Sequence, residues 1–144
     1  SKDKKMKSAT KSWLERHRSA NPFEIKKAPK DFADIKAGEM MLLPNSQIVA
    51  ALLHTIPRGQ SMEMKQFRAK LSQTHGAEIA CPVVTGINLR IVAEAAWEEH
   101  QMGKPLAELP PFWRVLNAKS PSTKKLAAGP DFVVQQRRAE GLPD

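Results

Sequence analysis

The side chains that carry nucleophilic, acid–base or metal chemistry are few in this 144-residue sequence and widely spaced. Cys81 is the only thiol, and its neighbours Ala80 and Pro82 include no base that would activate it, so a small buried thiol is the simpler interpretation. The four histidines show no pair at the spacing of zinc ligands, and Glu94 and Glu98 share a helix face that suits solvent. We therefore expect no metal and no cofactor.

Positive charge is the strongest feature of the composition, with 23 Lys and Arg against 15 Asp and Glu, a net +8. Residues 1–36 hold 11 basic and 5 acidic residues, which leaves residues 37–144 at only +2. A net positive charge favours a polyanionic partner such as DNA. No stretch approaches the roughly 20 apolar residues of a membrane span, and a single cysteine suits a reducing compartment. We expect no membrane partner and a cytoplasmic protein, associated with the nucleoid if it binds DNA.

The basic N-terminal segment, residues 1–36, contains few apolar side chains. So few apolar groups do not offset the entropy lost on ordering, which predicts a partly flexible basic arm. The aromatic side chains that remain as anchors are Trp13, Phe23 and Phe32. The length of residues 37–144 suits one folded domain, with order expected to begin near Pro44.

Apolar residues at helical spacing predict three helices in the first part of this domain, over about 46–56, 61–75 and 82–102. Asn45 or Ser46 suits the N-cap of the first helix and Ser61 that of the second. The short Pro-Arg-Gly connection between them is typical of a helix–turn–helix.

The C-terminal part is predicted to add the β structure. Residues 112–116, Phe-Trp-Arg-Val-Leu, have the composition of a strand, and the polar residues 117–125 suit a hairpin or wing loop. A last helix is expected from Asp131 to Gly141. The fold class is therefore mainly α with a small β hairpin.

Several short motifs follow one another along the domain: Ile56-Pro57-Arg58-Gly59, His75-Gly76-Ala77, Pro111-Phe112-Trp113-Arg114-Val115 and Glu140-Gly141. Their order resembles the DNA-binding domain of the methylated-DNA cysteine alkyltransferases and the alkyltransferase-like proteins, over roughly residues 40–142. The run from His75 to Arg114 is more closely similar to a divergent branch of small bacterial members of that family. The resemblance implies a winged helix–turn–helix, like the alkyltransferase C-terminal domain, and DNA as the partner.

The same resemblance predicts that the protein is not an enzyme. In the alkyltransferases a Pro-Cys-His-Arg-Val motif supplies the thiolate that takes the alkyl group and the histidine that activates it. Here those two positions are Phe112 and Trp113, which serve neither role. Glu140 is what remains of the family's network, and without its partners it is interpreted as a surface residue. Arg114 matches the family's arginine, and both an ion pair and a phosphate contact stay open for it.

A scaffold without catalytic groups still presents helices and cations to a polyanion. In a winged helix–turn–helix the second helix of the pair enters a groove, while neighbouring groups hold the phosphates. The candidate DNA contacts are Arg58, Lys65, Arg68, Arg90, Arg114, Lys124 and Lys125. A solvated basic surface explains each of them equally well. Arg68 and Arg90 lie off the expected apolar stripes, so reversing either charge is predicted to leave the fold intact.

Three functions of different class stay open. The first is a non-catalytic DNA-binding protein of the alkyltransferase-like type that recognises damaged or distorted DNA. The second is an interaction module for a protein or RNA partner that kept the fold without DNA recognition, supported by the near-neutral charge of residues 37–144. The third is an enzyme that uses Cys81.

Overall fold

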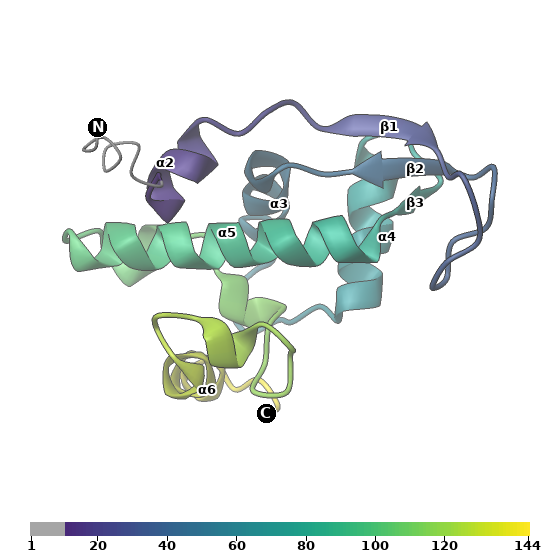
Figure 1. The fold of residues 1–144 in the computed structure, drawn as a ribbon. Coiled ribbons are helices and arrows are strands. Elements are labelled where there is room, and N and C mark those ends of the chain that lie inside the picture. The colour runs from purple at the N-terminus through teal and green to yellow at the C-terminus, as the bar shows by residue number, and fades with distance from the viewer. Residues whose placement is uncertain (1–10) are drawn as a thin grey trace, which may run out of the picture.

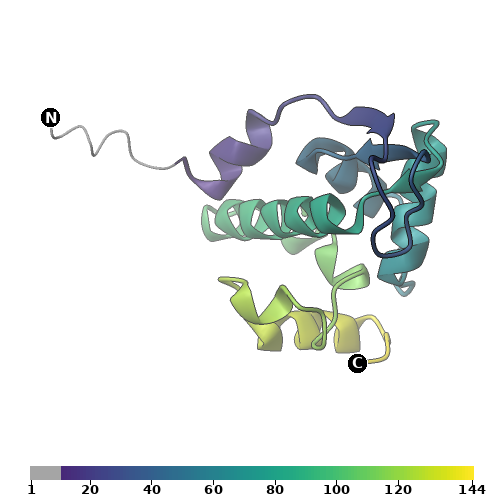
Figure 2. The same cartoon turned by 45° about the vertical axis from the view of Figure 1, so that its right-hand side comes forward.

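One long helix, α5 (Pro82–Gln101), runs through the middle of the molecule, and the other elements pack around it (Figure 1). The computed structural model describes residues 11–144, so residues 1–10 of the expected arm lie outside the described residues. The other helices of four residues or more are α2 (Trp13–Arg18), α3 (Ser46–Leu53), α4 (Met64–Thr74) and α6 (Pro130–Ala139). α2, α3 and a small sheet lie on one side of α5, and α6 lies on the other (Figure 1, Figure 2). No helix within residues 11–144 has the length and apolar character needed to cross a membrane.

The helices begin close to the predicted positions. Asn45 caps α3 by accepting a hydrogen bond from the Ile48 N–H at 2.9 Å, as expected of a side-chain cap. The expected cap at Ser61 is wrong, because α4 begins three residues later, after Glu63, whose side chain makes no capping hydrogen bond. α5 starts at Pro82, where a proline is tolerated since the first-turn N–H has no helical partner.

A three-stranded sheet covers one end of the fold, with strands in the order β1 (Glu24–Lys27), β2 (Met40–Leu43), β3 (Ile79–Ala80). β1 and β2 are antiparallel, whereas β2 and β3 are parallel, with Met41 opposite Ile79. Parallel neighbours need a crossover connection, and α3 and α4 supply it. The mainly helical class with a small sheet is thus confirmed.

The strand and hairpin expected over residues 112–125 are wrong. Phe112–Arg114 and Thr123–Lys125 each form one turn of 3₁₀ helix, and no strand lies in this segment. Two prolines, Pro110 and Pro111, precede Phe112 and have no N–H to donate to a strand ladder. Phe112 and Trp113 are both buried, whereas consecutive side chains of a strand point to opposite faces. The apolar composition of this segment reflects its burial in the core.

The expected basic arm contributes to the fold from residue 11 onward. α2 carries a capping box between Ser12 and Glu15 and buries Leu14. The Glu98 carboxylate of α5 also accepts hydrogen bonds from the backbone N–H groups of Trp13 and Leu14, at 3.3 and 3.0 Å. β1 pairs with β2, so the expected boundary after residue 36 falls between two strands of one sheet. Contacts with distant α5 and β2 order this segment, which its own composition does not reveal.

The core lies between α3, α4, α5 and the segment after Pro111. Its largest fully buried side chains include Leu53, Phe67, Leu71, Leu89 and Phe112. The apolar stripes predicted for the first two helices therefore face inward. The stripe predicted for the third is wrong in part, because Ile87 and Met102 are 54% and 71% exposed, and α5 packs inward through Leu89, Val92 and Ala96. The last predicted helix is also confirmed, as α6 with bounds Pro130–Ala139.

Candidate functional site

Phe112 and Trp113, the two positions that the sequence resemblance matched to a nucleophile and its base, are buried in the core. Phe112 is 0% exposed and Trp113 is 3% exposed. Their rings meet edge to face with centroids 5.2 Å apart, which is a favourable core arrangement. Neither ring is therefore available to stack on a nucleotide base, and neither carries a group for alkyl transfer.

Glu140 is not the surface residue that the sequence suggested, since its side chain is only 2% exposed. Arg114 donates to it through Nε and Nη2, at 2.8 and 2.9 Å, and Trp113 donates through Nε1 at 2.8 Å. The Gly59 N–H adds a fourth hydrogen bond at 3.2 Å. We call Glu140, Arg114, Trp113 and Gly59 the Glu140 junction, because it joins the turn after α3, the segment after Pro111 and the end of α6.

The Glu140 junction holds its carboxylate in the ionised form. Burial opposes ionisation, but the hydrogen bonds from Arg114, Trp113 and Gly59 outweigh it and lower the pKa of Glu140 to about 2. Arg114 also donates to the Ile56 carbonyl at 2.7 Å, so of the two roles left open for Arg114 the ion pair is the one that forms. Glu140 and Arg114 therefore stabilise the fold.

Arg68 is a second candidate DNA contact that the fold uses internally. It is 7% exposed, and its guanidinium makes a two-point ion pair with Asp34 at 2.8 and 3.0 Å. Nε and Nη2 both donate to the Ala80 carbonyl of β3. The hydrogen bond from Arg68 also holds the pKa of Asp34 below its usual value. Arg68 thus ties the loop between β1 and β2 to α4 and β3, and its predicted place on a solvent face is wrong.

The remaining candidate DNA contacts reach the surface. Arg58, Lys65, Lys124 and Lys125 are all exposed. Arg90 is half-buried, pairs with Glu94 at 3.3 Å and donates to the Lys125 carbonyl at 3.5 Å. Arg90 therefore links α5 to the 3₁₀ turn that carries two of the exposed lysines.

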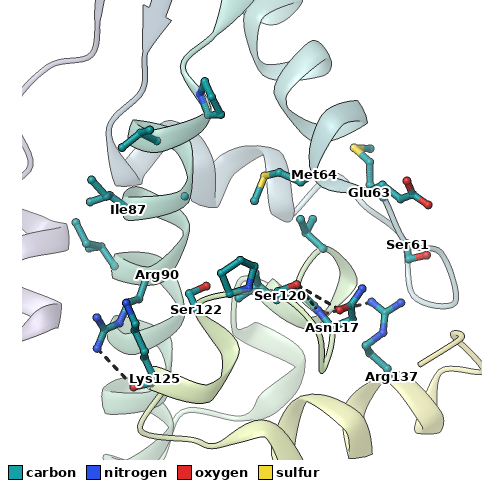
Figure 3. Close-up of a pocket in the computed structure, with 18 of the residues that line it drawn as sticks. Ser61, Glu63, Met64, Ile87, Arg90, Asn117, Ser120, Ser122, Lys125 and Arg137 are labelled. Atoms are coloured by element: carbon teal, nitrogen blue, oxygen red, sulfur yellow. Dashed lines mark hydrogen bonds between the residues drawn. The ribbon is translucent and has the colours of Figure 1, made fainter. Parts of the chain in front are cut away.

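A cleft of about 830 Å³ opens beside the first half of α5 (Figure 3). This volume lies within the range of roughly 300–1,000 Å³ that is usual for ligand sites. The walls come from α5, the start of α4, residues 115–125 and the C-terminal residues, with α2 at one end. Val83 and Ile87, one turn apart on α5, line it while 60% and 54% exposed. Exposed apolar side chains are common one at a time, but these two are neighbours on one helix face and lie inside a cleft.

Cations from several elements surround this apolar wall. The basic residues that line the cleft are Arg16, Arg90, Lys125 and Arg137, against two acidic residues, Glu63 and Asp144. The Trp13 ring lies between the guanidinium groups of Arg16 and Arg90, at 4.5 and 4.9 Å from its centroid. Sequence reasoning selected Arg90 and Lys125 but missed Arg16 and Arg137. Nothing local marks these two, because α2 and α6 reach the cleft only through tertiary packing.

The other side chains considered for nucleophilic or acid–base chemistry have structural roles. Cys81 is buried at 5% exposure, as expected of a packing thiol. The expectation that Glu94 faces solvent is wrong, because it is 3% exposed and accepts from the Ala127 N–H at 3.1 Å. Glu98 caps α2, as described above. No three His, Cys, Asp or Glu side chains gather as metal ligands in the part of the chain that the structure describes.

No protein-family model matches the chain, and neither does any of the curated proteins or solved structures with which it was compared.

Proposed function

We propose that this protein is a non-catalytic DNA-binding protein of the alkyltransferase-like type that binds DNA along the cleft beside α5. One observation carries the proposal: Arg16 from α2, Arg90 from α5 and Lys125 from the 3₁₀ turn surround the exposed first half of α5. Cations around a helix that is open to solvent suit a phosphate backbone, whose contacts position a protein on the duplex. No alkyl transfer is proposed, because the buried Phe112 and Trp113 supply neither nucleophile nor base.

In this proposal α4 and α5, with β3 between them, take the place of the helix–turn–helix pair, instead of the α3 and α4 that the Pro-Arg-Gly connection suggested. Residues 115–125 take the place of the wing. The first residues of a recognition helix are those that reach base edges in the major groove. On α5 these include Val83 and Ile87, whose exposed methyl groups suit contact with the methyl group of thymine. A cleft of about 830 Å³ has room for a nucleotide that has left regular stacking, and the proposal therefore takes damaged or distorted DNA as the preferred form.

The test is a matched pair of charge reversals. Lys124→Glu with Lys125→Glu reverses Lys125, which lines the cleft, and its exposed neighbour Lys124. Lys26→Glu with Lys27→Glu reverses two exposed lysines on β1, at the other end of the molecule (Figure 1). Fluorescence anisotropy with a labelled duplex, at several salt concentrations, measures the affinity of each. We expect the cleft variant to bind at least tenfold more weakly, with a salt slope smaller by about 0.9 for each phosphate that it no longer neutralises. The β1 variant should bind nearly as the unmodified protein does.

An equal loss of affinity in both double variants would show that binding follows overall charge and that the cleft is not the DNA surface. If the unmodified protein binds neither intact nor distorted duplex, the second candidate, an interaction module for a protein or RNA partner, takes precedence. The observation that favours it is the exposed pair Val83 and Ile87, which suits the apolar centre of a protein interface as well as it suits DNA.

A further inference from the structure

Arg137, in the last turn of α6, is a buried cation that has no carboxylate partner among the described residues. It is 5% exposed, and its Nε donates to the Pro143 carbonyl at 2.9 Å. Its Nη1 donates to the carbonyls of Trp113 and Leu116, at 2.7 and 3.4 Å. The nearby acidic side chains pair elsewhere, Glu140 with Arg114 and Asp144 with Arg138. Burial lowers the pKa of Arg137, and the more distant charges of Asp144 and Glu140 only partly oppose that effect.

Two donor groups at this place have no hydrogen-bond partner within residues 11–144. One is Nη2 of Arg137, and the other is Nδ2 of Asn117, whose Oδ1 already accepts from the Lys119 N–H at 2.8 Å. Both residues line the cleft, and the Asn117 side chain lies beside the Arg137 guanidinium (Figure 3). In the part of the chain that the structure describes, only the Thr85 hydroxyl is both fully enclosed and unpartnered, so these two nitrogens keep some contact with solvent.

We propose that Arg137 and Asn117 form a binding subsite for an oxyanion, and that in the proposed function this oxyanion is a phosphate of the DNA backbone. A guanidinium held by carbonyls lacks a counter-charge, and a phosphate oxygen at Nη2 supplies one through a charge-assisted hydrogen bond. The planar fork of arginine suits phosphate geometry. The Ser122 hydroxyl lines the same cleft and adds a further donor, whereas the Ser120 hydroxyl already donates to Asn117 Oδ1 at 3.4 Å. The identity of the phosphate carrier rests on the proposed function, whereas the subsite itself rests only on this geometry.

Asp144 is the residue that most directly competes with such a ligand. It lines the same cleft, and its carboxylate pairs with the exposed Arg138 at 3.3 Å. A carboxylate here repels an incoming oxyanion and is itself able to turn toward Arg137. Asp144→Asn should therefore leave phosphate binding unchanged or strengthen it.

The decisive variant is Asn117→Asp, because it places a carboxylate beside the Arg137 guanidinium (Figure 3). The oxygen that accepts from Lys119 is kept, and the internal carboxylate takes the place proposed for the ligand. Substitution of Arg137 itself is less informative, since it also removes three hydrogen bonds to the backbone. Asn21→Asp, an exposed position between α2 and β1, is the matched control with the same change of charge.

The experiment measures thermal unfolding of the three proteins in inorganic phosphate and in sodium chloride of equal ionic strength. At tenfold above its dissociation constant, phosphate should raise the Tm of the unmodified protein and of Asn21→Asp by about 4 °C. Asn117→Asp should have a higher Tm without phosphate and show no further rise with it. A phosphate effect that persists in Asn117→Asp, or its absence from the unmodified protein, overturns the subsite.

Duplex binding by the same variants identifies the source of the phosphate. A loss of affinity in Asn117→Asp but not in Asn21→Asp supports the DNA backbone. If the phosphate effect depends on Asn117 while no variant binds duplex, the subsite stands as one for free phosphate or a nucleotide, and the proposed DNA function fails by itself.

Discussion

The Glu140 junction and the cleft are neighbours along the chain, yet they satisfy buried charge in opposite ways. Arg114 belongs to the junction, and Val115, the next residue, lines the cleft. In the junction a carboxylate receives four hydrogen bonds and an opposite charge. In the cleft the guanidinium of Arg137 meets only carbonyls of the described residues and keeps one nitrogen free. A buried charge that has its counter-charge and all its hydrogen bonds within the protein stabilises the fold. A buried charge that lacks them and lies beside a cleft is available to a ligand.

The largest loss of stability is expected at Arg68, the other charge whose partners all lie within the protein. Arg68→Glu places a buried carboxylate against Asp34 and the Ala80 carbonyl. The Asp34 side chain is 40% exposed, but Arg68 is buried, so the new carboxylate is buried without a cation and beside a like charge. We expect a loss of more than about 3 kcal/mol in the free energy of unfolding, or an unfolded protein. Lys70→Glu, an exposed reversal on the same helix, should change the free energy of unfolding by only about 0.5 kcal/mol. Circular dichroism and urea unfolding compare the two variants. Equal stability would show that the internal contacts of Arg68 do not stabilise the fold.

A smaller loss of stability is expected from Glu140→Gln. The amide oxygen still accepts hydrogen bonds, but Arg114 loses its counter-charge in a site that is almost closed to solvent. We expect a loss of about 3 kcal/mol in the free energy of unfolding, measured in urea. Glu108→Gln, at an exposed position, is the control and should be close to neutral. If Glu140→Gln left the free energy of unfolding unchanged, the Glu140 junction would stabilise the fold through packing and hydrogen bonds and not through charge.

The pH dependence of stability gives a third and smaller effect. The pKa of Glu140 is lowered from its ordinary value of 4.5 to about 2, so the folded state holds the ionised form more strongly than the unfolded chain does. This contribution is nearly complete above about pH 5 and is lost as the pH falls toward 2. The part that is lost between pH 5 and pH 3 is about 2 kcal/mol. The difference in unfolding free energy between the unmodified protein and Glu140→Gln should shrink over that interval. A difference that stays constant would contradict ionisation of Glu140 as the source of stability.

The sequence predicted the elements whose signals are local. The helical spacing of apolar residues located α3, α4 and α5 within a few residues, and α6 began one residue from its predicted start. The segment at Phe112 was predicted as a strand because aromatic and branched residues favour both strands and buried turns, and only tertiary contacts decide between them. The predicted fold class, mainly α with a small β part, was therefore right, although the strands lie in other segments of the chain than predicted.

The candidate site was harder to predict because its partners are remote in sequence. Arg68 pairs with a residue 34 positions away and Arg114 with one 26 positions away, so their side chains looked like any exposed arginine. α2 was missed although Ser12 and Glu15 have the spacing of a capping box, which is a local signal. Its further support is remote, since Glu98 accepts from the Leu14 N–H, 84 positions away. Spacing reveals which face a residue occupies on its own element, but not what covers that face.

The parallel pairing of β2 with β3 sets an order of events for the folding of this chain. Local helices such as α3 and α4 form within microseconds, whereas Met41 and Ile79 meet only after the long segment between them has closed into a loop. β3 leads directly into Pro82, the first residue of α5. The start of α5, and with it the apolar wall of the cleft, therefore depends on a pairing of distant segments. An opening that separates β2 from β3 is expected to release the first turn of α5, so a partly unfolded chain loses the shape of the cleft together with the sheet.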